Sequence, residues 1–132
     1  MANEAIKRYD ESSGHGGVIQ DYNCGAGAIE KGTLLSLQDG RTCSGTVAIG
    51  VALAGIAARE KVAGDGRTRL AVYKKGYFDM IASGAITVGD PVVAAGHDNY
   101  VKEAGVQSGS AILGYAEETS EADEVIIIRV DL

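Results

Sequence analysis

The sequence is poor in the residues that build aromatic cores, disulfide scaffolds and membrane spans. Its 132 residues include no Trp, one Pro and two Cys, and only 5% of them are aromatic. Two cysteines are too few for a disulfide framework, and Cys24 and Cys43 lack the close spacing of a zinc site, so we expect buried, idle thiols in a reducing cytoplasm. The N-terminal residues are charged where a signal peptide is apolar, and no apolar run approaches the roughly 20 residues of a membrane-spanning helix. We therefore expect a protein that is made in the cytoplasm and has no membrane partner.

Basic residues are also fewer than acidic residues in the sequence. Eighteen acidic residues against twelve Lys and Arg give a formal net charge of -6, which argues against a nucleic-acid partner because phosphate binding needs a clustered basic surface. The charges are uneven, with basic residues gathered in 59–75 and acidic residues in 114–132. Each run has the composition of a solvated face. The alternative is that the basic run of one subunit meets the acidic run of the next, with these contact residues: Arg67, Arg69, Glu121 and Glu124.

Glycine and short apolar runs dominate what is present. Nineteen glycines cut the chain into runs of strand length, with turn compositions between them. These runs cover residues 33–37, 46–53, 68–73, 91–95, 110–116 and 124–130. The pattern predicts an all-β fold, a small barrel or sandwich, in one domain over residues 18–132. Residues 1–17 are polar and without period, which predicts a flexible arm, and the Ala-rich stretch 52–63 predicts one short helix.

One phrase occurs twice in the chain. Residues 28–38 read "AIEKGTLLSLQ" and residues 85–95 read "AITVGDPVVAA". The landmarks that follow in the same order are Gly32 with Gly89, Gly50 with Gly114, and Ala52 with Ala116. A lone hairpin cannot bury its apolar face, so the repeat predicts two similar β-meanders that pack to close one core.

The motifs of catalysis and of cofactor binding are absent from the sequence. None of the glycine clusters completes a phosphate-binding loop or a dinucleotide fingerprint. His15 falls in the arm and His97 in a turn, and neither has a second ligand or a nucleophile beside it in any recognisable pattern. The paired carboxylates at 117–118 and 123–124 flank a strand, where they remain hydrated and ionised. We therefore expect no catalytic residue, no cofactor and no metal.

The order of these runs resembles the small capsid cement or head decoration proteins of tailed bacteriophages. The resemblance covers about residues 17–132 and rests on "GAITVGDPVVAAGHDNYV", "IGVAL", "VYKKGYFDM" and the closing "ILGYAEET" and "EVIIIRVDL". It implies a non-enzymatic structural protein of the virion, which binds the major capsid protein on the outer head surface as a homotrimer and stabilises the shell. The alternative from another class is a small β-barrel enzyme or carbohydrate-binding module, which should show a concave pocket with perturbed titratable groups.

The N-terminal arm supplies the candidate capsid contacts. Ile6 and Tyr9 are the only sizeable apolar side chains before Val18 and are the expected anchors, with Lys7 and Arg8 reaching acidic coat surface. A polar segment that does not pack within its own subunit gains order by adding to the edge strand of a neighbour. The other interpretation is a disordered tail without contacts.

Overall fold

The protein is described from a computed structural model, which describes residues 5–9, 19–24, 27–38, 40–45, 47–64, 66, 68–96, 99–107 and 109–132. These residues form an all-β structure, which confirms the predicted fold class. Their strands are β1 (Ile6–Tyr9), β2 (Ile19–Cys24), β3 (Leu34–Leu37), β4 (Thr42–Ser44), β5 (Leu53–Ala57), β6 (Arg69–Tyr73), β7 (Lys75–Ala82), β8 (Pro91–Ala94), β9 (Tyr100–Glu103), β10 (Gly114–Ala116) and β11 (Val125–Asp131). A single turn of 3-10 helix, η1 (Gly109–Ala111), is the helical element of the described part.

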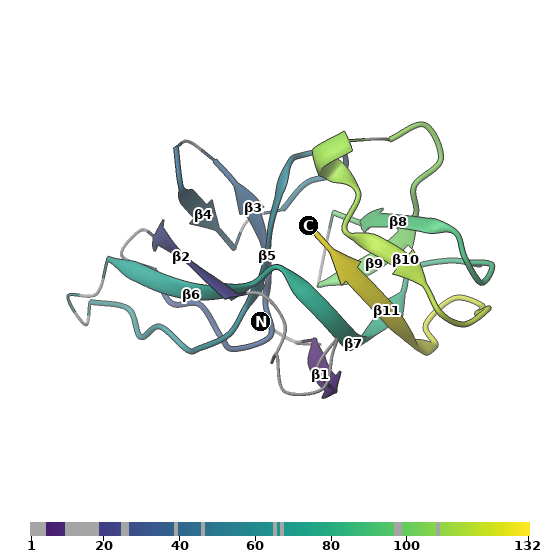
Figure 1. Ribbon diagram of the computed structural model, residues 1–132, viewed down its shortest axis with the longest axis horizontal. Helices are drawn as coiled ribbons and strands as arrows, with labels where there is room; N and C mark the ends of the chain where they lie inside the picture. The colour runs from purple at the N-terminus through teal and green to yellow at the C-terminus, as the bar shows by residue number, and fades with distance from the viewer. Residues whose placement is uncertain are drawn as a thin grey trace.

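The strands close into two five-stranded barrels that lie side by side (Figure 1). Barrel 1 has the order β2-β4-β3-β5-β6. Barrel 2 has the order β7-β11-β10-β8-β9, and the pairing of β7 with β9 closes its ring. The repeat in the sequence predicted two similar meanders that close one core, whereas each meander closes a barrel of its own.

The two barrels share one topology. In each, the first strand pairs parallel with the third and antiparallel with the fifth. The glycine of the repeated phrase has the same role twice, because Gly32 and Gly89 adopt φ of 89° and 87° and donate to the carbonyls of Ala57 and Ala116 at 2.8 and 2.7 Å. A positive φ of this size is readily adopted only by glycine, so the repeated sequence encodes the same turn at the start of each meander.

The strand register corrects the other two landmarks of the repeat. Gly55 in β5 lies opposite the second residue of β3, and Gly114 in β10 lies opposite the second residue of β8. Gly114 therefore corresponds to Gly55 rather than Gly50. By the same register Ala116 corresponds to Ala57 and not to Ala52. At both glycines a Cβ atom would collide with a backbone carbonyl of the neighbouring strand, which is why both positions are glycine.

The predicted helix at 52–63 is wrong, because this stretch begins with β5. All five residues of β5 are buried. Because both faces of the strand pack against other residues, its sequence is a continuous run of small and apolar residues and does not alternate between apolar and polar ones. Ala and Leu favour a helix in isolation, but burial on two faces overrides that weak preference.

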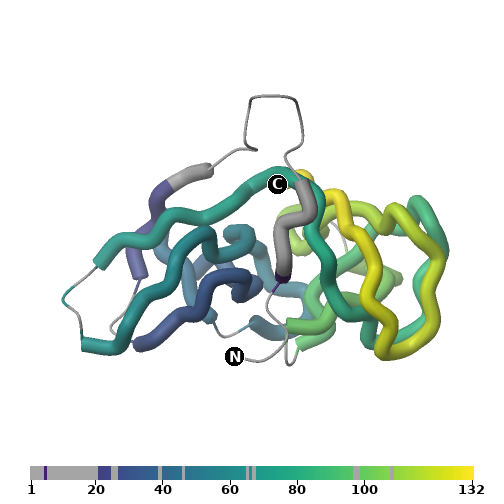
Figure 2. The backbone as a smooth tube through the Cα atoms, turned by 90° about the horizontal axis from the view of Figure 1, so that it is seen from below, coloured from purple at the N-terminus to yellow at the C-terminus, as the bar shows by residue number. Residues whose placement is uncertain are grey.

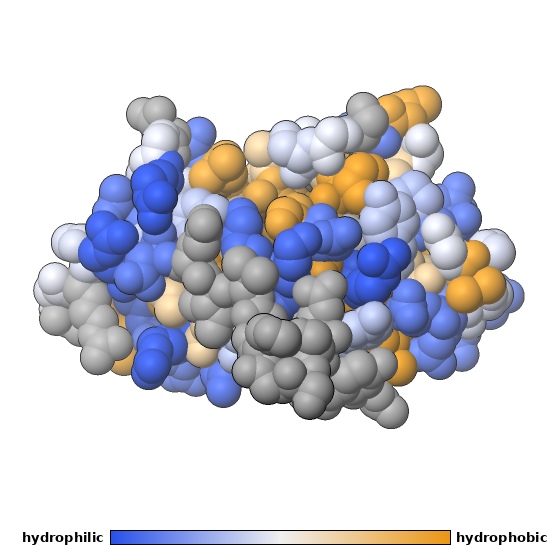
Figure 3. Space-filling view, in the orientation of Figure 1, coloured by the Kyte–Doolittle hydropathy of each residue, from blue (hydrophilic) through white to orange (hydrophobic). Residues whose placement is uncertain are grey.

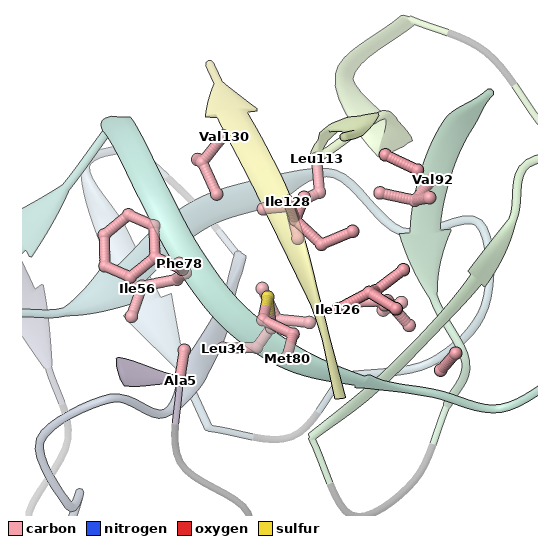
Figure 4. Close-up of a cluster of buried hydrophobic side chains, with 14 of the residues drawn as sticks. Ala5, Leu34, Ile56, Phe78, Met80, Val92, Leu113, Ile126, Ile128 and Val130 are labelled. Atoms are coloured by element: carbon pink, nitrogen blue, oxygen red, sulfur yellow. The ribbon is translucent and has the colours of Figure 1, made fainter. Parts of the chain in front are cut away.

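The β3–β5 pair is a wall that both barrels use. Leu35, Ala54 and Ala57 point into the core of barrel 1. Leu34 and Ile56, which alternate with them, join the larger core that fills barrel 2, where they lie near Phe78 and Met80 (Figure 4). The core of barrel 2 therefore extends onto this wall, while barrel 1 has a separate core on the other face of the wall.

Polar contacts reinforce this junction. Lys74 alone separates β6 from β7, and the chain crosses from one barrel to the other at this point (Figure 2). Its ammonium donates to the Tyr22 hydroxyl at 2.6 Å and to the Ala54 carbonyl at 2.9 Å. From barrel 2, the buried Asn99 accepts the Leu34 N–H at 2.6 Å and donates to the Gly32 carbonyl at 3.2 Å.

Part of the expected flexible arm is a strand. β1 pairs antiparallel with Tyr77, Phe78 and Asp79 of β7 in its own chain. Ala5 is buried in the core of barrel 2, and its N–H donates to the Gly32 carbonyl at 2.6 Å. The expectation that the arm does not pack within its own subunit is therefore wrong for residues 5–9, while residues 1–4 and 10–17 lie outside the described residues. The edge of β7 recruits the strand because β11 covers only the opposite edge.

Candidate interaction surfaces

The loops at the two ends of the molecule are structural equivalents with different charges. The β5–β6 loop and the β10–β11 loop occupy the same place in barrel 1 and barrel 2, and they lie at opposite ends of the long axis (Figure 1). The β10–β11 loop presents five exposed acidic residues, which are Glu117, Glu118, Glu121, Asp123 and Glu124. It forms an acidic end of the molecule.

Within the acidic end, several carboxylates also hold the hairpin in shape. Glu124 accepts the Glu121 N–H at 2.5 Å, and Glu118 accepts the Ile127 N–H at 2.9 Å. Glu121 and Glu124, both predicted as subunit contacts, thus lie together in one exposed turn. These two hydrogen bonds tie the carboxylates to the backbone of the hairpin.

The basic run does not form a single surface. Arg59 and Arg69 are exposed at the opposite end, and Arg67 lies outside the described residues. Lys61 is 3% exposed and donates to the Gly27 carbonyl at 3.2 Å. Lys75 pairs with Asp131 of the acidic run in the same chain. Some of the basic side chains of this run are therefore engaged in contacts within the subunit and do not contribute to a basic surface.

The candidate capsid contacts lie along one sheet edge. Residues Ile6, Lys7, Arg8 and Tyr9 constitute β1, which is the terminal strand of the barrel 2 sheet. A terminal strand presents unpaired backbone N–H and carbonyl groups on its outer side, which is the usual template for adding a strand from another chain. The sequence located these residues by composition, but their pairing with β7 depends on contacts about 70 residues away and carries no local signal.

Apolar surface gathers over the junction of the barrels (Figure 3). The side chains of Ile49 and Val106 are 47% and 93% exposed and come from equivalent loops of the two barrels. These loops touch the opposite barrel, because Gly96 lies against the Ile49 side chain and Gly50 against the Gln107 amide.

A pocket of about 580 Å³ opens at barrel 1. It is lined by Gly27, Ala28, Ile29, Glu30, Thr33, Gln38, Thr42, Cys43, Ser44 and Gly45. Burial, with a smaller contribution from Cys24, raises the pKa of the Cys43 thiol to about 11, so the thiol is protonated and a poor nucleophile at neutral pH. The Thr33 hydroxyl is buried and has no hydrogen-bond partner in the described structure. The described lining thus mixes apolar and polar uncharged residues, and Glu30 is its one charged member.

The described residues contain neither a cluster of metal ligands nor a membrane-spanning helix. These residues bring together no group of three His, Cys, Asp or Glu side chains that could hold a metal ion. In the same part of the chain no helix is long and apolar enough to cross a bilayer. His15 and His97, the two histidines of the sequence, lie outside the described residues.

Comparison with known proteins gives one informative likeness. No protein-family model matches the sequence, and no curated protein matches it. Among solved structures, the fold matches the N-terminal base of the head fibre protein gp8.5 of bacteriophage phi29, with a TM-score of 0.55 and 20% sequence identity. The match covers 86% of this chain and 93% of the phi29 chain. The tandem arrangement of strands is therefore one that a phage head fibre base also adopts.

Proposed function

We propose that this chain is a structural protein of a tailed phage that binds the outer surface of the head, without enzymatic activity. The observation that carries the proposal is the likeness of nearly the whole fold to a phage head fibre base. The order of the sequence motifs that resemble head decoration proteins supports it independently. Within that role we infer a decoration protein that binds the major capsid protein as a homotrimer and stiffens the shell.

Physical considerations favour a trimer for such a role. One small subunit makes only modest contact with a shell, whereas three linked copies bind with avidity and bridge several coat subunits. The acidic end and the end with exposed Arg69 face opposite directions along one molecule, so a contact between them is head-to-tail. A head-to-tail contact repeated about a threefold axis closes a ring.

The central experiment compares particles with and without the protein. Purified protein is added to heads that lack it, and the particles are imaged by electron microscopy and heated with a nuclease present to detect DNA release. We expect extra density at local threefold positions and a higher temperature of DNA release. Absence of binding to heads, with the protein folded and trimeric by light scattering, would contradict the proposed role.

Charge reversal tests the subunit contact. Reversal of Arg67 and Arg69 to Glu should weaken self-association, and more strongly at low salt, because screening is then weakest. Simultaneous reversal of Glu121 and Glu124 to Lys should restore part of the association. Light scattering and native mass spectrometry measure both effects. An additive loss without rescue would mean that the two runs are only solvated faces.

β1 is the proposed contact with the coat. Its backbone pairs with β7 on one side, which leaves its outer side for an extended coat segment, with Ile6 and Tyr9 as anchors and Lys7 and Arg8 facing acidic coat surface. The variant Lys7→Glu/Arg8→Glu should lower occupancy on heads. The matched control, Arg41→Glu/Lys102→Glu, changes the charge equally in other parts of the chain and should bind normally. If both variants occupy the heads equally, β1 does not contact the coat protein.

The pocket supports one alternative, a carbohydrate-binding module. The unpartnered Thr33 hydroxyl lies on the wall of a pocket of about 580 Å³, a size typical of small-ligand sites. None of the described residues that line it is aromatic, so these residues offer no ring on which a sugar could stack. Calorimetric titration with oligosaccharides from bacterial surfaces tests this alternative, and saturable binding that Thr33→Val abolishes would favour it over a purely structural role.

A further inference from the structure

Cys24 and Cys43 lie directly opposite each other on neighbouring strands. The parallel pair β2–β4 has the register Asn23 to Thr42 and Cys24 to Cys43. Both cysteines are buried thiols that form no disulfide in the structure, and both belong to the core of barrel 1, so their side chains share one face of the sheet. Directly paired residues lie about 5 Å apart between strands, which falls within the Cα separation that a disulfide spans.

The pair stands where barrel 1 closes. Only the two residue pairs named above join β2 to β4 in the described structure, so this seam of barrel 1 is short, like the β3–β4 and β5–β6 seams. The equivalent position of barrel 2 pairs Ala82 with Val101, which cannot be cross-linked. A covalent bond here would close a loop of about 20 residues that contains the whole of β3.

A small oxidant has a route to the pair. Cys43 is 2% exposed but lines the partly open pocket of about 580 Å³. The raised pKa of Cys43 leaves little thiolate at neutral pH, which keeps the pair reduced for long periods there and makes oxidation faster in mild alkali.

We propose that Cys24 and Cys43 are a latent disulfide that forms across the β2–β4 seam when the protein meets a low-molecular-weight disulfide such as oxidised glutathione. The Cys43 thiolate attacks the oxidant, forms a mixed disulfide in the pocket and releases one glutathione thiolate. The Cys24 thiolate then attacks the Cys43 sulfur and releases the second glutathione. The protein loses two protons and two electrons, and the oxidant is reduced to two thiols. This inference does not depend on the proposed function.

The experiment oxidises the full-length protein with oxidised glutathione at about pH 8.5, a pH that supplies thiolate. Intact mass spectrometry should show a loss of about two mass units, thiol labelling after unfolding should show no free thiol, and the midpoint of thermal unfolding should rise by roughly 10 °C. Reduction with dithiothreitol should reverse all three changes.

Two variants make the test specific. In Cys24→Ala the first step proceeds but the second does not, so a stable glutathione adduct should accumulate on Cys43. The variant Cys24→Ala/Cys43→Val carries the residue pair of barrel 2 and should show no response to the oxidant. The inference is overturned if the wild-type protein remains fully reduced, stops at a glutathione adduct, or forms only disulfides between subunits.

Discussion

The buried amide of Asn99 offers the sharpest test of how the two barrels are joined. Asn99 is 5% exposed and bonds to the backbone of β3 and its preceding turn in the other barrel. In Asn99→Ala, the Gly32 carbonyl keeps the Ala5 N–H as a donor, but the buried Leu34 N–H loses its acceptor. An unsatisfied buried N–H costs about 1–3 kcal/mol.

Backbone conformation adds a second contribution. Asn99 has a φ of 63°, in the left-handed region, where Ala is less stable than Asn by roughly 1 kcal/mol. We therefore expect Asn99→Ala to lower the free energy of unfolding by about 3 kcal/mol. The variant Asn99→Gly removes the amide without that backbone strain, so it should lose about 2 kcal/mol.

Denaturant unfolding measures these differences, because a shift in midpoint at constant slope reports stability alone. Asp123 supplies the matched control, since it has a φ of 67° but lies exposed in the β10–β11 loop. Asp123→Ala should lose only about 1 kcal/mol and Asp123→Gly almost nothing. If Asn99→Gly is as stable as the wild-type protein, the amide does not stabilise the junction and the reasoning fails.

Three further outcomes are expected. Gly55→Ala and Gly114→Ala should each lower stability by more than about 3 kcal/mol or prevent folding, because the added Cβ meets a backbone carbonyl; Gly64→Ala, at an exposed turn with open space, is the control and should lose about 1 kcal/mol. Hydrogen bonding from the Lys75 ammonium lowers the pKa of Asp131 from its ordinary value of 3.8, so its stabilisation is present above that pH and is lost as the pH falls through the lowered value. Asp131→Asn should therefore be less stable than the wild-type protein near neutral pH and equal to it in strong acid, and a difference independent of pH would contradict this assignment. Deletion of residues 2–16 should lower the thermal midpoint because it removes β1 and buried Ala5, and an unchanged midpoint would mean that β1 adds nothing.

The strands were predictable because their determinants are local. Short apolar runs between glycines located β3, β8 and β11, and the repeated Gly32 and Gly89 marked the turn that begins each meander. The stretch that became β5 misled the prediction because small residues such as Ala54 and Gly55 suit a strand packed tightly on both faces. Such packing is a property of the tertiary structure and leaves no period in the sequence.

The candidate surfaces were less predictable, because they depend on which charged side chains form contacts within the subunit and which remain exposed. The sequence separates basic from acidic residues, yet Lys61 and Lys75 are engaged within the subunit, by the Gly27 carbonyl and by Asp131. Likewise, the facing of Cys24 and Cys43 follows from a parallel register between strands that are not consecutive. Neither the spacing of the cysteines nor the order of the charges contains this information.

The common wall of β3 and β5 gives the molecule a mechanical property. A load applied between its two ends passes through side chains packed on both faces of this wall, and the covalent crossing at Lys74 is held by the Tyr22 hydroxyl and the Ala54 carbonyl. Two barrels on a flexible linker would fold towards each other under compression and transmit little force. This chain should instead behave as a short rigid strut, whose ends keep their separation when whatever they touch is pushed apart or together.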